Sequence, residues 1–427
     1  MKITIIGTGY VGLTSAACLA ELGHEILCCD VDEKKIAELM QGKVPFFEPG
    51  LEQLLKRNSA KKLQFTTDKK RAINFGEVIF NCVGTPSGSN GEADLSAVFS
   101  VARDVAQADS RTDKIFVIKS TVPPGTAREI QKITGEIAVV SNPEFLREGE
   151  AIRAFQYPDK IVFGAQSEEA LQKMRKVYAG RLRTYLPIVE TDWETAEIIK
   201  YASNAMLATR ISAINEIANI CDQVKADIKM VSAALGMDYR IGPRFLNAGV
   251  GWGGSCFPKD VKAIVHTAKQ HGYEAKLFEE AFRLNEKQKV RIVEKIKESF
   301  KKIDGKVFCI WGLSFKPKTS DMREAPSITI INELLKHQAI VKAYDPEAMD
   351  EAKKIFGNNI AYAKSPEEAA KDAHAIILVT EWDEFRGIDF VELKKTMKDN
   401  KLFDGRNIYE PELVREDGFE YYGMGRK

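Results

Sequence analysis

Gly7-Thr8-Gly9-Tyr10-Val11-Gly12 lies between a strand-like run, residues 2–6, and a helix-like run, residues 11–22. With this spacing the first glycine permits a tight turn, the second lets backbone amides approach a pyrophosphate, and the third lets helix and strand pack closely. The pyrophosphate would lie at the helix N-terminus, where free amides and the helix dipole favour an anion. The stretch therefore predicts a dinucleotide-binding unit of the Rossmann type.

An acidic residue, Asp30, ends the next strand-like run, residues 25–30. A carboxylate in that position accepts hydrogen bonds from both hydroxyls of a ribose and repels a 2′-phosphate. NAD is therefore expected rather than NADP, although Lys35, five residues further on, would soften the preference. The alternative is an ordinary turn followed by a solvated aspartate. It does not account for the position of the glycines between a strand and a helix, with an acid at the end of the next strand.

The composition of the 427-residue chain is that of a globular protein with two or three domains. Its formal net charge of +1 gives no electrostatic argument for nucleic acid or an anionic membrane as partner. The seven cysteines form no CxxC pair or Cys/His cluster, so we expect no metal site and reduced thiols in the cytoplasm. Residues 1–20 have some features of a signal peptide, but their spaced glycines fit a nucleotide turn better. No run reaches the about 18 apolar residues of a membrane helix.

Strand-like and helix-like runs alternate through the first part of the chain, which predicts a parallel, doubly wound sheet. A long helix is expected from Thr191-Asp192-Trp193-Glu194, which has capping-box spacing, to Val224, because this stretch contains no proline or glycine. More helix is expected to about residue 300. The later strands of the first part are expected at residues 78–83, 115–119, 137–140 and 161–163.

The alternation resumes after Asp304-Gly305. The expected fold class is α/β, with two Rossmann-like, doubly wound parallel-sheet domains joined by a long central helix. Only Gly312 follows the first strand here, so a second NAD is not expected. The expected domains are 1–195 for NAD binding, 196–300 for the central helices and 301–427 for the smaller α/β domain. Its strands are expected at residues 306–311, 340–344, 375–380 and 401–404, and a helix at 327–337.

Cys256 lies in the run Gly251-Trp252-Gly253-Gly254-Ser255-Cys256-Phe257-Pro258-Lys259-Asp260. The glycines let backbone and ligand approach closely, and Pro258 suits the first turn of a helix, expected over residues 261–272. The positive end of the helix dipole and the charge of Lys259 both favour the thiolate, which is the nucleophilic form. An inert loop cysteine fits the same description, so the interpretation requires an electrophile, such as an aldehyde, for the thiol to attack.

Two polar residues four positions apart, Lys200 and Asn204, share one face of the expected long helix. Such a pair is usually a solvated stripe. Beside an NAD-binding fold, a partly buried lysine and an amide can instead hold an alcohol oxygen during hydride transfer and stabilise oxyanions. Loops after strands supply Glu144, as base or water-positioning acid, and Thr121, as a hydrogen-bond donor. Asp260, four residues after the cysteine, would cap the helix or orient water.

Basic residues lie near expected strand ends and loops of the smaller domain, where ligands bind in open α/β sheets. Each alone would be interpreted as a solvated cation, but as a group they suit a phosphate-bearing ligand. They are Lys316, Lys318, Arg323 and Arg406.

Over essentially its whole length the sequence resembles the UDP-glucose/GDP-mannose dehydrogenase family. The most specific matches are Asn142 to Gly149 (NPEFLREG) and Gly253 to Asp260 (GGSCFPKD). Trp252 stands where the family more often has Tyr or Phe, a conservative departure. The other matching segments are Gly7 to Gly12, Asp30 to Asp32, Phe47 to Leu51, Ser120 to Gly125, Lys200 with Asn204, and Gly312 to Glu324.

The resemblance implies roles for individual residues and no metal. Arg244 would reach the substrate of a neighbouring subunit, because the family dimerises around its central helices. The residues implied in catalysis are Cys256, Lys200, Asn204, Asp260, Glu144 and Thr121. The implied cofactor contacts are Gly7, Gly9, Tyr10, Val11, Gly12, Asp30, Lys35, Thr85, Thr121, Glu148, Lys259 and Arg323. The implied substrate contacts are Glu144, Phe145, Leu146, Arg147, Glu148, Lys200, Asn204, Arg244, Phe245, Leu246, Asn247, Ala248, Gly249, Gly253, Lys316 and Arg406.

The implied reaction is an NAD-dependent four-electron oxidation of UDP-glucose to UDP-glucuronate, through a thiohemiacetal and a thioester on Cys256, with two NADH produced. The implied enzyme is a cytoplasmic homodimer whose C-terminal domain binds the uridine diphosphate. The nearest alternative is the same chemistry on GDP-mannose or UDP-N-acetylmannosamine. A two-electron 3-hydroxy-acid dehydrogenase would share the NAD fold and the Lys/Asn pair but would not need Cys256. A non-catalytic nucleotide-sugar sensor would be expected to lack part of the site.

Overall fold

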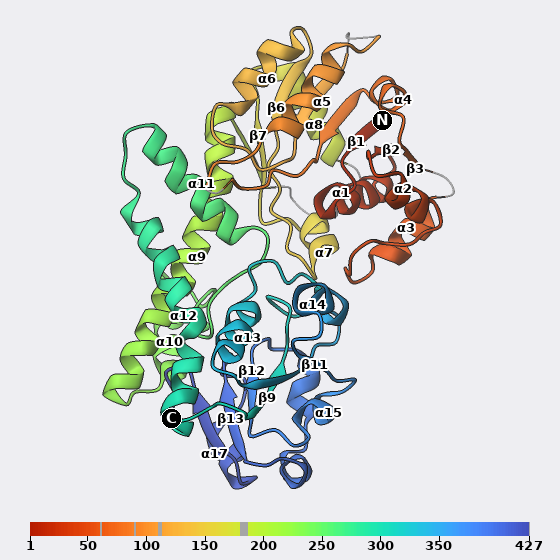
Figure 1. The fold of residues 1–427 in the computed structure, drawn as a ribbon. Coiled ribbons are helices and arrows are strands. Elements are labelled where there is room, and N and C mark those ends of the chain that lie inside the picture. Colours follow the sequence, from red (N-terminus) through yellow and green to blue (C-terminus); the bar gives the residue numbers. More distant parts are fainter. Residues whose placement is uncertain (60–61, 89–90, 110–112, 180–186, 427) are drawn as a thin grey trace. The chain divides into compact units, whose positions relative to one another are not determined.

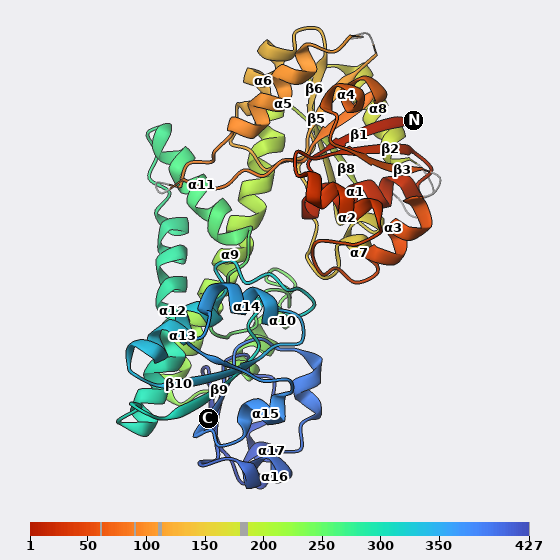
Figure 2. The same ribbon diagram turned by 45° about the vertical axis from the view of Figure 1, so that its right-hand side comes forward.

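The computed structural model describes residues 1–59, 62–88, 91–109, 113–179 and 187–426. The chain divides into two compact units (Figures 1 and 2), Met1–Ser203 with Ala263–Tyr273, and Asn204–Lys262 with Glu274–Lys427. Two helices, α9 (Trp193–Val224) and α11 (Phe257–Gln270), contribute residues to both units. None of the helices within these ranges combines the length and apolar character that crossing a bilayer requires.

The first unit is built on an eight-stranded sheet with the order β3-β2-β1-β4-β5-β6-β7-β8. Its first six strands have the Rossmann order, in which the strand order reverses between β1 and β4; open α/β sheets bind their ligands at this point, beside the carboxyl ends of the strands. Neighbouring strands are parallel except for β6 and β7, which pair in antiparallel fashion at Ser141 and Gly164. The strands are β1 (Lys2–Ile6), β2 (Glu25–Cys29), β3 (Leu63–Thr66), β4 (Val78–Asn81), β5 (Ile115–Ile118), β6 (Ala138–Ser141), β7 (Ile161–Gly164) and β8 (Ile188–Thr191).

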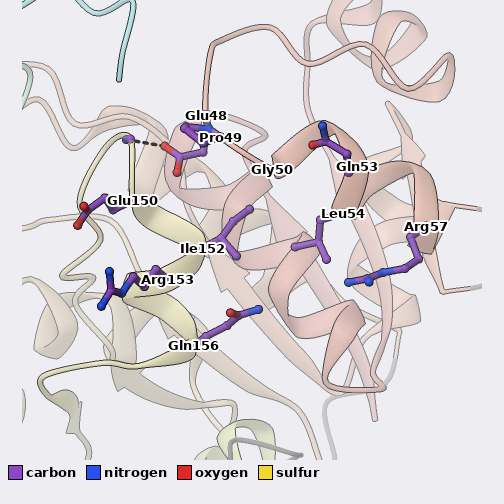
Figure 3. Close-up of a pocket in the computed structure, with 11 residues that line it drawn as sticks. Glu48, Pro49, Gly50, Gln53, Leu54, Arg57, Glu150, Ile152, Arg153 and Gln156 are labelled. Carbon is purple, nitrogen blue, oxygen red and sulfur yellow. Dashed lines mark hydrogen bonds between the residues drawn. The ribbon is translucent and has the colours of Figure 1, made fainter. Parts of the chain in front are cut away.

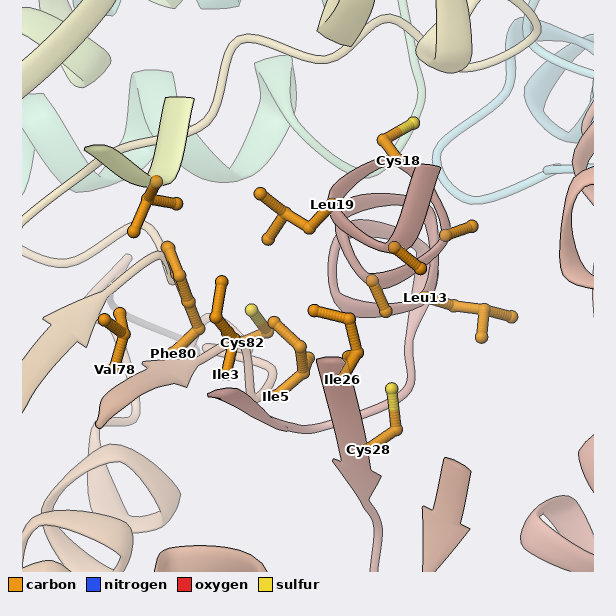
Figure 4. Close-up of a cluster of buried hydrophobic side chains, with 14 of the residues drawn as sticks. Ile3, Ile5, Leu13, Cys18, Leu19, Ile26, Cys28, Val78, Phe80 and Cys82 are labelled. Carbon is orange, nitrogen blue, oxygen red and sulfur yellow. The ribbon is translucent and has the colours of Figure 1, made fainter. Parts of the chain in front are cut away.

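Helices cover both faces of this sheet, so its central strands are buried on both sides and are almost continuously apolar. Figure 4 shows one face, where Ile3 and Ile5 of β1 and Phe80 of β4 pack with Leu13 and Leu19 of α1. A second cluster, which includes residues of α5 and α6, covers the other face. The helices are α1 (Tyr10–Glu21), α2 (Glu33–Met40), α3 (Leu51–Ser59), α4 (Lys69–Phe75), α5 (Ser96–Ala106), α6 (Thr126–Thr134), α7 (Ala151–Gln156) and α8 (Glu168–Tyr178).

The second unit contains a six-stranded parallel sheet with the order β11-β10-β9-β12-β13-β14. Counted from its own first strand this is the same Rossmann order, so both sheets of the α/β prediction are confirmed. The strands are β9 (Val307–Trp311), β10 (Ile340–Tyr344), β11 (Ala361–Tyr362), β12 (Ala375–Leu378), β13 (Lys401–Asp404) and β14 (Glu420–Gly423). The helices wholly in this unit are α10 (Ile228–Met237), α12 (Lys276–Phe300), α13 (Pro326–Lys336), α14 (Met349–Phe356), α15 (Pro366–Ala370), α16 (Phe390–Leu393) and α17 (Pro411–Glu416).

The four strands that sequence analysis missed are the edge strands of the two sheets. They are β3 and β8 in the first sheet and β11 and β14 in the second. Each is short and partly exposed, as in β8, where Ile188 and Thr191 are half-buried and the residues between them are exposed. An edge strand has a pairing partner on one side only and little apolar surface to bury, so it lacks the apolar run that marks a central strand.

The long helix α9 has the predicted end at Val224 but begins differently from the predicted capping box. Thr191 ends β8, and the side chain of Asp192 accepts hydrogen bonds from the backbone N–H (2.8 Å) and hydroxyl of Thr195. Asp192 therefore caps the helix, and the predicted cap at Thr191 is wrong by one residue. The helix after the cysteine, α11, begins at Phe257, four residues earlier than predicted, so Cys256 directly precedes it.

Candidate active site

The glycine turn has a shape that fits a dinucleotide. Gly7 has a φ of +96°, and its N–H donates to Cys29 O at 2.8 Å. A Cβ on Gly12 would collide with the carbonyl of Gly7, whereas a Cβ on Gly9 would meet nothing within 4 Å. Gly9 is the N-cap of α1 and provides no side-chain hydrogen bond to the first amides of the helix. This is the arrangement a pyrophosphate needs.

Asp30 stands at the carboxyl end of β2 and is held by the same turn. Its Oδ2 accepts hydrogen bonds from Thr8 N (2.8 Å) and Thr8 Oγ1 (2.6 Å) and pairs with Lys35 Nζ at 3.0 Å. Burial opposes ionisation, but these hydrogen bonds dominate and lower the pKa of Asp30 to about 2. The carboxylate is therefore charged at neutral pH and oriented by the glycine turn, as recognition of a ribose requires.

Glu48, a residue to which sequence analysis gave no role, joins this turn to the loop after β6. Its buried carboxylate accepts hydrogen bonds from Gly149 N (2.6 Å) and Ala151 N (2.8 Å), and from the Tyr10 hydroxyl. Glu48 therefore caps α7 and fixes the loop that carries Glu148 against the first turn of α1. The signal available in the sequence was an acid beside Pro49-Gly50, which is also what an ordinary turn contains.

A cavity of about 550 Å³ lies beside Glu48, between α3 and α7 (Figure 3). The residues lining it include none of the candidate catalytic, cofactor or substrate residues. Leu54 and Ile152 form its apolar part, and Glu48 directs its carboxylate to the backbone of Gly149. This cavity is distinct from the glycine turn and from the residues proposed for chemistry.

Thr121 lies in the loop after β5, and this loop is tied down at both ends. The hydroxyl of Thr85 donates to Thr121 O at 2.9 Å, so two predicted cofactor residues from separate loops are brought together. At the other end, Glu197 of α9 accepts hydrogen bonds from Gly125 N (2.7 Å) and Ala127 N (2.8 Å) at the start of α6. Glu197, one turn before Lys200, was missed because a single acid in a helix has no distinguishing sequence signal.

Glu197 is only 2% exposed, and this burial raises its pKa to about 8 against the two backbone hydrogen bonds, which lower it. The folded protein thus holds this proton more tightly than the unfolded chain, so the stabilisation is complete below pH 4.5 and is lost as the pH rises toward 8. Between pH 5 and 8.5 we expect the wild type to lose roughly 2–4 kcal/mol more unfolding free energy than Glu197→Gln. Urea unfolding across this range measures the difference.

Glu194→Gln is the matched control, because Glu194 lies on the same helix but is only half-buried and pairs with Arg128 at 2.7 Å. Its pKa is lowered by the Arg128 guanidinium, so it gives no loss of stability in this window. If Glu197→Gln and Glu194→Gln show the same pH dependence as the wild type, the raised pKa of Glu197 is wrong.

Glu144 and Lys200 form a buried ion pair in the first unit. Lys200 Nζ lies 2.9 Å from Glu144 Oε1, and both side chains are less than a tenth exposed. Burial favours the neutral acid, but the Lys200 charge and hydrogen bond, together with the Leu146 N–H, lower the pKa of Glu144. Lys200 Nζ also lies 5.4 Å from the centroid of the Phe145 ring. Glu144 is therefore a carboxylate, which accepts a proton or orients water but does not donate a proton.

In the second unit, Asp260 gathers three of the remaining candidates. It is fully buried in the first turn of α11, where its N–H donates to Cys256 O at 2.8 Å. Its Oδ2 accepts from Asn204 Nδ2 at 2.6 Å, and its Oδ1 pairs with Lys259 Nζ at 2.6 Å. Two motifs 56 residues apart, the helical Lys/Asn pair and the cysteine run, are thus joined through Asn204 and Asp260.

Cys256 is the one free cysteine of the described residues that is not buried; the other six are buried. Its Sγ lies 3.6 Å from Ser255 Oγ. The backbone before it approaches its neighbours closely: a Cβ on Gly253 would overlap the backbone of Glu324, and one on Gly254 would lie 2.8 Å from the Phe315 ring. The glycines of this run are therefore required by packing.

Arg406 and the run from Arg244 to Gly249 are the predicted substrate residues of the second unit. Arg406 donates to the carbonyls of Val379 (2.7 Å) and Gly251 (3.2 Å), so part of its guanidinium holds strand-end loops in place. Arg244 and Asn247 are exposed, Leu246, Ala248 and Gly249 are buried, and Phe245 has a left-handed φ of +61°. Lys316 lies over Phe315 at 5.4 Å from the ring centroid.

The cofactor candidates are divided between the units. Lys259 and Arg323 belong to the second unit, where Arg323 makes a two-point contact with Asp321 at 2.9 and 2.7 Å. The other cofactor candidates belong to the first unit. Among the substrate candidates of that unit, Arg147 lies 3.8 Å from Asp159, and Glu148 is half-buried.

The first turn of the second sheet repeats the geometry of the first with one glycine in place of three. Gly312 has a φ of +89°, and its N–H donates to Tyr344 O at 2.9 Å, as Gly7 does to Cys29. Asp345 occupies the position of Asp30, but its two oxygens accept hydrogen bonds from four backbone N–H groups, those of residues 313, 314, 347 and 348, and from the Trp382 indole. Both carboxylate oxygens are thus occupied by hydrogen bonds within the protein, which supports the expectation of no second NAD there.

Comparisons with known proteins match three parts of the chain to one family. Residues 1–181 match the NAD-binding domain of the UDP-glucose/GDP-mannose dehydrogenase family, residues 194–287 its central domain and residues 309–411 its UDP-binding domain. The chain is 45% identical to a UDP-glucose 6-dehydrogenase of Rhizobium meliloti over 437 aligned residues, with 100% of both chains covered. It is 42% identical to the UDP-glucose 6-dehydrogenase TuaD of Bacillus subtilis, with 100% of this chain and 93% of the relative covered.

Solved structures also match the chain over its whole length. A UDP-glucose dehydrogenase from the archaeon Pyrobaculum islandicum is 34% identical with a TM-score of 0.92, covering 100% of this chain and 98% of that one. A UDP-D-ManNAc dehydrogenase from Pyrococcus horikoshii is 27% identical with a TM-score of 0.87, covering 100% and 99%. By its matched domains and its full-length relatives, the chain belongs to the UDP-glucose/GDP-mannose dehydrogenase family.

Proposed function

We propose that this protein is an NAD-dependent UDP-glucose 6-dehydrogenase. UDP-glucose, two NAD⁺ and one water would give UDP-glucuronate, two NADH and the released protons. The observation that carries the proposal is the nucleophile: Cys256 directly precedes α11, and Asp260 in the first turn of that helix is bonded to Asn204. The substrate assignment rests on the full-length relatives at 41–45% identity that are UDP-glucose 6-dehydrogenases.

The glycine turn and Asp30 would hold NAD⁺, which would supply the oxidant for each hydride removed from C6. NADH would leave and a second NAD⁺ would take its place before the second oxidation. Lys200 and Asn204, one turn apart on α9, hold the C6 oxygen and stabilise the oxyanions that develop on it. The hydroxyl proton leaves to a base or to water, and the Cys256 thiolate then attacks the aldehyde carbon to form a thiohemiacetal. Loss of the second hydride gives a thioester, which water hydrolyses.

Hydrolysis of the thioester requires a positioned water, and three candidate residues have the chemistry for it. Glu144 is held as a carboxylate by Lys200 and accepts a proton from water. Asp260 has both oxygens engaged, by Asn204 and Lys259, so its role is to orient these groups and the first turn of α11. Thr121 contributes a hydroxyl from a loop fixed by Thr85 and Glu197.

The proposed organisation follows the expected domains: residues 1–195 bind NAD, 196–300 form the dimer and 301–427 bind the uridine diphosphate. The proposed state is a cytoplasmic homodimer. The cofactor and substrate residues proposed are those implied by the resemblance. For NAD the fit is supported by the open space at Gly9 and the uncapped start of α1.

The test of the proposed function is the stoichiometry of NADH formed per mole of UDP-glucose consumed. Two NADH are expected, whereas a two-electron dehydrogenase gives one. GDP-mannose and UDP-N-acetylmannosamine are assayed side by side, because the likeness to the UDP-D-ManNAc dehydrogenase of Pyrococcus horikoshii makes that sugar the second candidate. A higher kcat/KM for either of them than for UDP-glucose would overturn the substrate assignment.

Asp30→Ser tests the cofactor preference. Loss of a charged acceptor for two ribose hydroxyls, at roughly 1.5–3 kcal/mol per bond, is expected to lower kcat/KM for NAD by about 10²- to 10⁴-fold. The repulsion of a 2′-phosphate is lost too, so kcat/KM for NADP is expected to rise. Asp68→Ser is the control, since Asp68 caps α4 through Arg71 N at 2.9 Å. An unchanged ratio of NAD to NADP in Asp30→Ser would contradict the assignment.

A further inference from the structure

The loop that leads to Cys256 is irregular, yet every residue from Ala248 to Gly254 is buried. Buried backbone outside helices and sheets must find hydrogen-bond partners elsewhere. Here side-chain amides from two helices supply them. Asn285 of α12 accepts from Trp252 N at 2.8 Å and donates to Trp252 O at 2.9 Å, so it grips this residue as a neighbouring strand would.

A second grip holds the beginning of the same loop. Gln288, one turn after Asn285 on α12, donates from Nε2 to Gly249 O at 2.8 Å. Asn215 of α9 accepts from Gly249 N at 2.8 Å. Asn285, Gln288 and Asn215 are each at most 3% exposed. The N–H and C=O groups of Gly249 and Trp252 are therefore all satisfied by three buried amides, which we call the amide clamp.

The loop is shaped to receive this clamp. Gly251 has a φ of +97°, and a Cβ added to it would lie 2.8 Å from Asn285 Oδ1. The Trp252 indole donates to Ser212 Oγ at 3.1 Å and packs edge-on against Phe257, with ring centroids 6.2 Å apart. Phe257 is the first residue of α11 and follows Cys256 directly. Fixing Trp252 therefore also fixes Phe257, the residue that follows Cys256 in the chain.

We propose that the amide clamp, and Asn285 above all, positions the Cys256 thiol for attack on the aldehyde. The clamp residues are positioning residues, because they act through the backbone of the loop. The inference rests on the proposed function, in which Cys256 is needed for the second oxidation but not for the first. It follows that loosening the clamp slows the second oxidation selectively. A small displacement of a nucleophile lowers its reaction rate far more than it weakens substrate binding.

The test is Asn285→Ala, with the two oxidations measured separately. Rapid mixing with UDP-glucose and NAD gives the rate of the first NADH, and the purified UDP-sugar 6-aldehyde gives the rate of the second. We expect the second rate to fall by about 10- to 100-fold while the first changes by less than about threefold. KM for NAD is expected to stay the same. Equal losses in both rates, or no loss in either, would overturn the inference.

Asn407→Ala is the matched control. Asn407 is 2% exposed and grips Met424 in the same two-point manner, at 2.8 Å to its O and 2.9 Å from its N, and reaches Ala248 O only at 3.5 Å. It is expected to lose stability like Asn285→Ala without a selective loss of the second oxidation. If Asn285→Ala does not fold, Gln288→Met decides the question by the same ratio of rates, because it removes the hydrogen bond to Gly249 O, together with the one from Asn219 Nδ2 at 2.8 Å, and leaves both contacts to Trp252 in place.

Cys256→Ser separates this inference from the function on which it rests. If Cys256→Ser turns over normally, the covalent mechanism is wrong. If Cys256→Ser stops the second oxidation but Asn285→Ala and Gln288→Met keep the wild-type ratio of the two rates, the covalent mechanism stands and the positioning role of the clamp is wrong.

Discussion

Cys256→Ser is expected to lower steady-state NADH formation by about 10³-fold or more, with at most one rapid NADH per active site. Serine keeps its proton at neutral pH, so its hydroxyl attacks an aldehyde far more slowly than a thiolate. The first hydride transfer needs only the alcohol, the NAD site and the oxyanion donors. The variant should therefore stall after oxidation begins, with a covalent or tightly held intermediate. Rapid-mixing measurement of NADH and intact-protein mass spectrometry detect the two signatures.

Cys221→Ala is the control for this experiment, because Cys221 is buried at 4% exposure in α9 and has no proposed role in the chemistry. Its turnover is expected to match the wild type. Iodoacetamide should modify Cys256 before the six buried cysteines. Near-normal NADH turnover in Cys256→Ser would reject the covalent role of the thiol, whatever happens in the control.

Lys200→Ala is expected to lower kcat by about 10²- to 10³-fold, the usual effect of removing one preorganised oxyanion donor. NAD affinity should change little, because the glycine turn and Asp30 keep their contacts. The buried Glu144 loses the partner that holds it as a carboxylate at 2.9 Å. Steady-state kinetics and a fluorescence titration with NAD measure the two quantities.

The stability of this variant must be separated from its chemistry, since an uncompensated buried charge costs about 3–5 kcal/mol. In the double variant Lys200→Ala with Glu144→Gln, the unpaired charge is gone and most of the unfolding free energy is expected to return. The value of kcat is expected to remain low, because neither lysine nor carboxylate is restored. A collapse of NAD affinity in Lys200→Ala would instead make Lys200 a cofactor residue.

Much of the fold could be predicted from the sequence because its signals are local. The glycine turn, Asp30 at the end of β2 and the central strands were found from short runs, and β1, β10 and β13 lie within one residue of their predicted bounds. The edge strands were missed because edge positions bury too little apolar surface to leave a pattern. The cap of α9 was displaced by one residue because both Thr191 and Asp192 are chemically suited to capping.

The same distinction between local signals and long-range contacts applies to the candidate site. Sequence analysis identified Glu144, Lys200, Asn204, Cys256 and Asp260, but it did not predict how they pair. The pairing of Glu144 with Lys200 and of Asn204 with Asp260 spans 56 residues in each case. Such contacts depend on how helices and strands pack, and no spacing within a motif encodes them.

By itself the sequence determined that the chain has a Rossmann-type NAD turn, an acid for the ribose and a cysteine before a helix, because these features depend on neighbouring residues and local backbone geometry. Only the tertiary structure decided that Glu144 is a carboxylate, that Glu197 secures the Thr121 loop and that Asn285 grips Trp252. Burial removes water from these polar groups, and each must then find its partner across the fold.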